Sequence, residues 1–419
     1  GALLLLSAGA AASTADPGHH RPGGPRSWVG TWAAVPTATP ESATPILEDE
    51  TVRQVVHTSV GGDRVRLRLT NEAGTSPLRI GEVRVALRAG SSGTDTAPDT
   101  DRPVTFGGSA SATIPAGAPM LSDPVDLRLP PRSDLVVSIH LPERTAVTTL
   151  HGFSFQENAV AAGNVTGKPS VTPTGTMTQW HFLSGVSVRA RGKHTGAVVA
   201  LGDSITDGSE TTAGANNRWP DLLAERVGAR TGVLNSGIAG NRLLHDPNPP
   251  EGSDAEDYAA FFGQSALRRF DRDVLAQPGA EHVIVLLGVN DLGHPGTSAP
   301  MSETVTAEEI IGGHRQLIAR AHAAGLRAYG GTVLPFKGDT LGFYSEENEA
   351  KRQAVNEWIR TSGEYDAVID FAEAMRAPDD PLRLNPAYDS GDHLHPNDAG
   401  MAAMAEAVPT RLFRPGRAH

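Results

Sequence analysis

Four short polar blocks of this sequence contain the residues that could carry chemistry. The first is Gly-Asp-Ser at 202–204, and the last is Asp392-His393-Leu394-His395, just before a helical stretch near the C-terminus. A serine hydroxyl is a poor nucleophile until an adjacent base accepts its proton. An imidazole three residues after a carboxylate can donate a hydrogen bond to it within one loop, which fixes the tautomer and orientation of the ring. These two blocks therefore contain the residue types of nucleophilic catalysis.

The two middle blocks are rich in glycine and asparagine. One spans 235–242 and contains Gly240, and the other spans 287–291 and contains Asn290. Glycine lets the backbone approach a ligand closely and present its N–H groups. An asparagine at the end of a strand can cap the next helix, or it can direct its side-chain amide into a cleft.

Each block also has a purely structural explanation, which is a plain turn for 235–242 and a helix cap or a surface histidine for 392–395. A Gly-Asp-Ser turn can cap a helix through Asp203 and Ser204, and taken alone this block favours that explanation. Asp392, His393 and His395 could together bind a metal ion, but the spacing offers no further ligand. The sequence has no cysteine, which excludes disulfides, thiolate zinc sites and cysteine nucleophiles. We therefore expect no metal site and no cofactor.

The first half of the chain has the pattern of an all-β domain. Between residues 51 and 191 apolar and polar residues alternate, as where Val65, Leu67 and Leu69 lie between arginines. A period of two is typical of strands with one buried face. The pattern predicts a jelly-roll-like β-sandwich of about eight short strands. The segment 28–32 is expected to be its first strand or a tie between two domains.

After Gly196 short apolar runs alternate with helical stretches. Strands are expected at 198–201, 232–234, 283–287, 327–333 and 367–370. Helices are expected at 220–227, 307–324, 346–361 and 397–408. Alternating strands and helices predict an α/β domain with a parallel sheet covered on both faces. Ligands of such folds bind beyond the carboxyl ends of the strands, where all four blocks lie.

The length of 419 residues favours two domains, because one hydrophobic core seldom serves so long a chain. An apolar run at 1–12, followed by small residues at 13–15, is typical of a secretory signal, so we expect a secreted, extracellular protein. The expected divisions are a truncated signal peptide at 1–15, a linker at 16–27, a β-sandwich domain at 28–192 and a catalytic domain at 196–415.

Two classes of partner are disfavoured. The formal net charge is −12, and an acidic surface repels the phosphate backbone of a nucleic acid. No later segment approaches the ~20 consecutive apolar residues of a membrane helix, so we expect no integral membrane association.

Taken together, the four blocks resemble those of the SGNH (GDSL) hydrolase family, in particular secreted bacterial members with an N-terminal β-sandwich. The resemblance covers about half of the chain, at 198–412, and rests on GDS at 202–204, Gly240, GVND at 288–291 and DHLH at 392–395. It implies a flavodoxin-like sheet. It also implies that Ser204 is the nucleophile, His395 the base and Asp392 the residue that orients His395. The oxyanion hole would consist of the backbone N–H groups of Ser204 and Gly240 and the side chain of Asn290.

The resemblance implies an ester substrate, small or part of a polysaccharide or lipid. We expect a small or medium acyl ester, with an acetyl group on a polysaccharide as one candidate. A lipase or lysophospholipase is the alternative within the family. A carbohydrate-binding protein with a degenerate hydrolase domain is the alternative from another class, and the intact Ser, Asn, Asp and His set argues against it. Loops 252–263 and 335–346 are expected to set specificity, and Trp180, Trp219 and Phe261-Phe262 are candidates to line a cleft.

Overall fold

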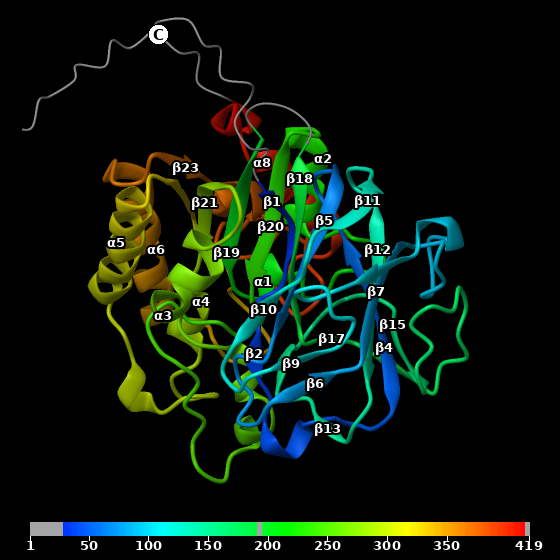
Figure 1. The fold of residues 1–419 in the computed structure, drawn as a ribbon. Coiled ribbons are helices and arrows are strands. Elements are labelled where there is room, and N and C mark those ends of the chain that lie inside the picture. The colour runs from blue at the N-terminus through cyan, green and yellow to red at the C-terminus, as the bar shows by residue number, and fades with distance from the viewer. Residues whose placement is uncertain (1–27, 191–194, 415–419) are drawn as a thin grey trace, which may run out of the picture.

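The computed structural model describes residues 28–190 and 195–414, which form two units packed side by side (Figure 1). The predicted signal peptide at 1–15 and linker at 16–27 lie outside the described residues. So do residue 192 and residue 415, where the two domains were expected to end. No helix of the described part is long and apolar enough to cross a membrane.

The N-terminal unit is an antiparallel β-sandwich, as the alternating pattern predicts. Its five-stranded sheet contains β1 (Trp28–Ala33), β18 (Leu183–Ala190), β5 (Gly62–Thr70), β10 (Pro119–Leu121) and β11 (Val125–Leu129). Its six-stranded sheet contains β16 (Gly175–Met177), β15 (Asn158–Ala162), β4 (Glu50–His57), β12 (Asp134–Leu141), β7 (Glu82–Leu87) and β8 (Arg102–Val104). Alternate residues of a strand face the same side of the sheet, so the apolar residues Val65, Leu67 and Leu69 of β5 are all buried in the core.

The expected number of about eight strands is too low. Short strands complete the unit: β2 (Thr37–Ala38), β3 (Ile46–Leu47), β6 (Leu78–Ile80), β9 (Ala112–Ile114), β13 (Thr145–Ala146), β14 (Thr149–His151) and β17 (Trp180–His181). Strands of two or three residues are too short to show a period in the sequence. The six-stranded sheet is regular at its centre, where β12 pairs with β4 from Asp134↔His57 to Leu141↔Glu50 without a bulge.

The C-terminal unit contains the predicted parallel sheet. Its order is β20-β19-β21-β22-β23, with β19 (Gly196–Gly202), β20 (Thr231–Gly237), β21 (Ala280–Leu286), β22 (Arg327–Gly331) and β23 (Ala367–Ile369). Numbered within the unit, this order is 2-1-3-4-5, the flavodoxin-like order. The strand order reverses between β19 and its neighbours, which is where ligands bind in such sheets.

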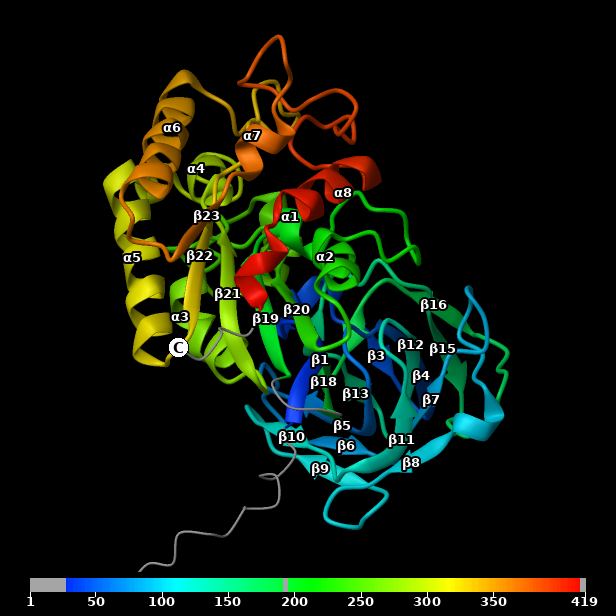
Figure 2. The same ribbon diagram turned by 90° about the horizontal axis from the view of Figure 1, so that it is seen from above.

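Helices cover both faces of this sheet (Figure 2). They are α1 (Ser204–Asp207), α2 (Trp219–Val227), α3 (Ala266–Phe270), α4 (Val289–Gly293), α5 (Ala307–Ala323), α6 (Glu346–Thr361), α7 (Phe371–Met375) and α8 (Asp398–Ala407). Short single turns are η1 (Glu41–Ala43), η2 (Pro98–Thr100), η3 (Asp254–Asp257), η4 (Ala259–Phe262), η5 (Asp271–Leu275), η6 (Met301–Glu303) and η7 (Thr410–Phe413). Buried residues of α3, α5 and α6 belong to one apolar cluster with Val199 and Val283, whereas those of α2, α7 and α8 belong to another with Val198 and Ile284.

The two units meet where β1 lies along β20. The Gly30 N–H donates to the Pro278 carbonyl at 2.7 Å, and the Val233 N–H donates to the Ser59 hydroxyl at 2.9 Å. A side chain on Gly232 would collide with the Gly30 carbonyl, so glycine is required for this close approach. The segment 28–32 therefore has both of its expected roles, as the first strand of the sandwich and as a contact to the second unit.

Candidate active site

Ser204 is the first residue of α1 and follows β19 directly. The Asp203 side chain caps this helix by accepting the Ile205 N–H at 3.0 Å, so the structural explanation of the Gly-Asp-Ser turn holds for Asp203. Ser204 is left to face another partner, at the carboxyl end of β19.

A chain of hydrogen bonds joins Ser204 to the loop before α8. Ser204 Oγ lies 2.8 Å from His395 Nε2, and His395 Nδ1 lies 2.5 Å from Asp392 Oδ2. Because a carboxylate only accepts, Nδ1 donates to Asp392, which leaves Nε2 to accept the serine proton. The three predicted catalytic residues are thus brought together across 191 residues of sequence.

Asp392 is held in its ionised form. Its other oxygen, Oδ1, accepts the backbone N–H groups of Leu394 at 2.9 Å and His395 at 2.8 Å. Burial acts to raise the pKa of the Asp392 carboxyl, but the hydrogen bonds from His395 and Leu394 outweigh it and hold that pKa well below its usual range. Asp392 thus holds the ring of His395 with Nε2 directed at Ser204.

His393 points elsewhere. It has a left-handed backbone with φ of +62°, and its Nδ1 hydrogen-bonds Asp389 instead of Asp392. The loop therefore contains two Asp–His pairs, of which the pair Asp392–His395 contacts Ser204. The metal alternative needs His393 and His395 to converge, and they do not. Among the described residues no group of three or more His, Cys, Asp or Glu side chains is arranged to hold a metal ion.

The two predicted oxyanion-hole blocks lie beside each other after β20 and β21. Gly240 has φ of +79°, a conformation that favours glycine, and a side chain there would collide with the ring of Phe262. Asn290 is buried in α4, and its Nδ2 donates to the Asn241 carbonyl at 3.0 Å. An amide nitrogen carries a second hydrogen, which stays available for a ligand oxygen.

Residues 200–403 match the GDSL-like lipase/acylhydrolase family. Every predicted catalytic and oxyanion residue lies within that match. Residues 200–403 form a GDSL-like hydrolase domain. The family cleaves carboxylic esters, so the chain is a carboxylic ester hydrolase with an N-terminal β-sandwich. A search of characterised proteins found no significant match.

Several solved structures are similar to about half of this chain. A putative lipolytic G-D-S-L protein from Desulfitobacterium hafniense DCB-2 is 23% identical over 52% of this chain and 98% of its own, with a TM-score of 0.36. The carbohydrate acetylesterase Est24 from Sinorhizobium meliloti is 14% identical over 51% and 95%, with a TM-score of 0.38. The aryl esterase of M. smegmatis is 17% identical over 51% and 95%, with a TM-score of 0.38.

A buried arginine that the sequence analysis did not single out supports the site of the GDSL-like domain. Arg269 of α3 is almost fully buried and donates to the Gly202 carbonyl at 3.1 Å, the Ser236 carbonyl at 2.9 Å and the Asn241 side chain at 2.9 Å. Its ion-pair partner is Asp273 at 3.4 Å. Burial lowers the pKa of Arg269 to about 10, so the guanidinium stays charged at neutral pH. Arg269 thereby connects the ends of β19 and β20 with residues 238–242, which contain Gly240 and are here called the oxyanion loop.

Asp291 supports the same loop of the GDSL-like domain from the other side. Its carboxylate accepts the N–H groups of Leu243 at 2.8 Å and Leu244 at 3.0 Å. Burial raises the pKa of Asp291, and the two backbone hydrogen bonds oppose that rise. Asp291, the fourth residue of the GVND block, therefore holds the backbone at Leu243 and Leu244 in place, next to the predicted oxyanion donor Asn290.

Aromatic side chains line one side of the oxyanion loop in the GDSL-like domain. The ring of Phe262 packs on Gly240 and lies 5.0 Å from the ring of His294, which lies 5.7 Å from Phe343. Burial, with the charge of Arg242, lowers the pKa of His294 to about 3, so this ring is neutral. Both loops expected to set specificity thus reach this wall, the first through Phe262 and the second through Phe343.

Of the two tryptophans that were candidates to line a cleft, Trp180 lines a small cavity between the two units, whereas Trp219 is part of the core. Trp219 is fully buried under the sheet, with its ring 5.4 Å from that of Phe371. Trp180 is buried in the sandwich, where its indole N–H donates to the Val55 carbonyl at 2.9 Å. Large aromatic side chains usually complete cores, and their sequence positions alone did not reveal that these two do so.

Proposed function

We propose that this hydrolase cleaves esters of small or medium acyl groups through a covalent acyl-enzyme on Ser204. The observation that carries the proposal is the unbroken chain of hydrogen bonds from Ser204 Oγ through His395 to the ionised Asp392. A serine is activated by such an adjacent base, and the base is oriented by the carboxylate behind it.

The proposed reaction has two halves. Ser204 Oγ attacks the ester carbonyl while its proton passes to His395 Nε2, and the carbonyl oxygen becomes negatively charged. The backbone N–H groups of Ser204 and Gly240 and the amide of Asn290 stabilise that oxyanion. His395 then protonates the departing alcohol, leaving the acyl group on Ser204. A water molecule, deprotonated by His395, then attacks the acyl carbon. The bond to Ser204 Oγ breaks, His395 returns the proton to Ser204, and the acid leaves.

The aromatic wall supports a short acyl group. Phe262 fills the space against Gly240, and His294 and Phe343 fill the space behind it. An acyl chain bound on this side would meet packed rings within a few carbon atoms. A short chain therefore fits better than the long chain of a lipase or lysophospholipase substrate.

The test is hydrolysis of p-nitrophenyl esters of increasing acyl length, together with acetylated polysaccharides. We expect kcat/KM to be highest for acetate to butyrate and to fall for octanoate. Ser204→Ala should remove nearly all turnover while the protein stays folded. A Ser204→Ala variant with a tenth of the wild-type activity would refute the nucleophile, and a preference for octanoate would favour the lipase alternative.

Neighbouring phenylalanines provide a matched pair of variants. Phe262 packs on Gly240, whereas Phe261 packs against Gly152 of the sandwich. Phe262→Ala should increase relative activity on longer acyl chains, and Phe261→Ala should not. If both variants keep the wild-type chain-length profile, Phe262 does not limit the acyl group.

We further propose that the enzyme acts outside the cell, on the basis of the composition of residues 1–15. Fusing a reporter enzyme to the C-terminus of the chain, expressed from its own gene, tests this. We expect the reporter in the culture medium, and its retention in the cell would contradict the proposal.

A further inference from the structure

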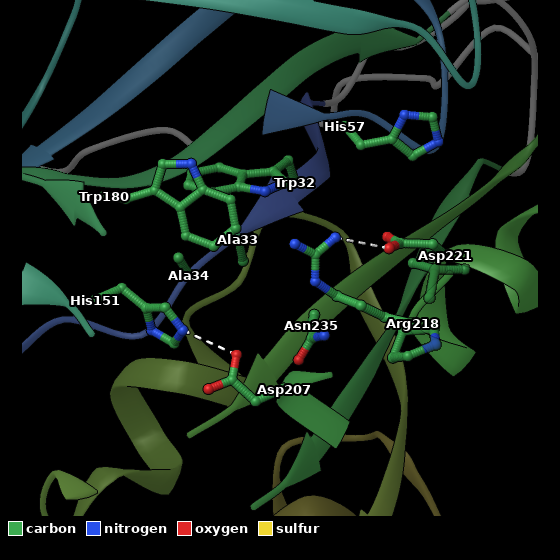
Figure 3. Close-up of a pocket in the computed structure, with 12 residues that line it drawn as sticks. Trp32, Ala33, Ala34, His57, His151, Trp180, Asp207, Arg218, Asp221 and Asn235 are labelled. Atoms are coloured by element: carbon green, nitrogen blue, oxygen red, sulfur yellow. Dashed lines mark hydrogen bonds and ion pairs between the residues drawn. The ribbon is translucent and has the colours of Figure 1, made fainter. Parts of the chain in front are cut away.

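The carboxylate of Asp207 joins three parts of the molecule. Asp207 is the last residue of α1, one helical turn after Ser204. Its Oδ2 accepts the N–H of Ala239 at 2.9 Å, and Ala239 directly precedes Gly240. Its Oδ1 lies 2.9 Å from Nε2 of His151, which ends β14 of the sandwich (Figure 3). One side chain thus connects the nucleophile helix, the oxyanion loop and the other unit.

His151 is fixed by hydrogen bonds on both ring nitrogens. Nδ1 lies 2.9 Å from the Val35 carbonyl, and Nε2 faces the Asp207 carboxylate. Carbonyl and carboxylate oxygens only accept, so both ring nitrogens donate and the ring carries a positive charge. Burial acts to lower the pKa of His151, but the charge and hydrogen bond of Asp207 outweigh it and raise that pKa. The side chains of His151 and Asp207 are 3% and 4% exposed, so the pair is shielded from water.

The other charged side chains around Asp207 and His151 have ion-pair partners of their own. Both line a small cavity of about 20 Å³ between the units, beneath Trp180 (Figure 3). Arg218 faces the same cavity but pairs with Asp221 at 2.9 Å. His57 also lines it and lies 2.6 Å from Asp134 of its own unit. The neighbouring charges are therefore already paired and cannot replace His151.

We propose that His151 of the β-sandwich is a positioning residue of the hydrolase site, acting through Asp207 on the Ala239–Gly240 peptide of the oxyanion hole. This inference rests on the proposed function. Without His151, the buried carboxylate of Asp207 loses its charged partner and the hydrogen bond that fixes its direction. This loss weakens its hold on Ala239, and the Gly240 N–H loses its fixed direction. The sandwich is then a part of the active site and not an independent module.

The test compares three variants in the full chain. His151→Leu removes both hydrogen bonds, and His151→Gln keeps an amide that can donate to Asp207. His57→Leu is the control, since His57 lines the same cavity and pairs within the sandwich. Steady-state hydrolysis of p-nitrophenyl acetate, the rate of Ser204 phosphonylation by a fluorophosphonate and the melting temperature are measured for each, beside wild type and Ser204→Ala.

We expect His151→Leu to lower kcat and the phosphonylation rate together by about 10- to 100-fold, with little change in KM, because a displaced donor is lost mainly in the transition state. His151→Gln should recover most of the loss, and His57→Leu should keep the wild-type kcat even if it melts earlier. An unchanged kcat in His151→Leu, an equal loss in His57→Leu or no recovery in His151→Gln would overturn the inference alone. Wild-type protein without esterase activity would overturn the proposed function, and the inference with it.

Discussion

The two Asp–His pairs of the DHLH loop allow a sharp test of the catalytic assignment. In Asp392→Asn, the amide oxygen can still accept the Leu394 and His395 N–H groups, so the loop keeps its shape. The amide nitrogen, however, replaces the oxygen that lies 2.5 Å from His395 Nδ1. Nδ1 must then accept, the ring proton moves to Nε2, and Nε2 can no longer take the proton of Ser204.

The expected loss is that of a triad with the wrong tautomer, about 10⁴-fold in kcat. At ~1.4 kcal/mol for each factor of ten, this equals about 5 kcal/mol of transition-state stabilisation. Asp389→Asn is the matched control, because Asp389 makes the same kind of bond to His393, which does not contact Ser204.

The assay is hydrolysis of p-nitrophenyl acetate by both variants at pH 8, with melting temperatures to confirm folding. We expect Asp392→Asn to be nearly inactive and Asp389→Asn to stay within a few-fold of wild type. Equal losses in the two variants would show that the loop matters only as a structure. A loss below tenfold in Asp392→Asn would refute the orienting role of Asp392.

Three further predictions follow from the site. Asn290→Ala should lower kcat by about 10²–10³-fold with much less effect on KM, as for removal of one oxyanion donor; a raised KM with normal kcat would make Asn290 a ground-state binding residue. Burial raises the pKa of Asp203 to about 7, so the folded protein keeps a proton that the unfolded chain releases above about pH 4. Stability should therefore fall as pH rises from about 4 to 7, and urea unfolding of Asp203→Asn should show a smaller fall; equal pH slopes in the two proteins would contradict this. EDTA should not change activity, and a loss that zinc restores would contradict the serine mechanism.

Local signals were sufficient for much of the catalytic domain. Helix α6 has the predicted bounds because Ser345 caps it, accepting the Asn348 N–H at 3.0 Å, and the sequence that follows favours a helix. The strand expected at 327–333 ends at Gly331 instead. The last two residues of the expected strand, Thr332 and Val333, form hydrogen bonds with side chains distant in the sequence. The Val333 N–H, for example, donates to the side chain of Asn356 at 2.7 Å. Such a partner cannot be identified from local sequence.

The site shows the same division between local and distant contacts. The four blocks were visible because each follows a strand, and parallel strands bring their carboxyl ends to one edge. Arg269 acts through carbonyl groups 33 and 67 residues away, and His151 acts on a carboxylate 56 residues away. A charged pair four residues apart, such as Arg269 and Asp273, is also common on exposed helices, and an isolated histidine at the end of a strand has no distinctive pattern. Both residues gain their roles only through tertiary contacts.

The contact between β1 and β20 has a consequence for solubility. β20 is the outermost strand of the parallel sheet, and such edges offer unpaired backbone groups to strands of other molecules. Here the sandwich lies over that edge, Gly30 approaches Gly232, and Ser59 occupies the N–H of Val233. Separating the hydrolase domain from the sandwich would uncover this strand and favour aggregation between copies. The N-terminal unit thus prevents strands of other molecules from pairing with the edge of the catalytic sheet, as a capping repeat does at the end of a repeat protein.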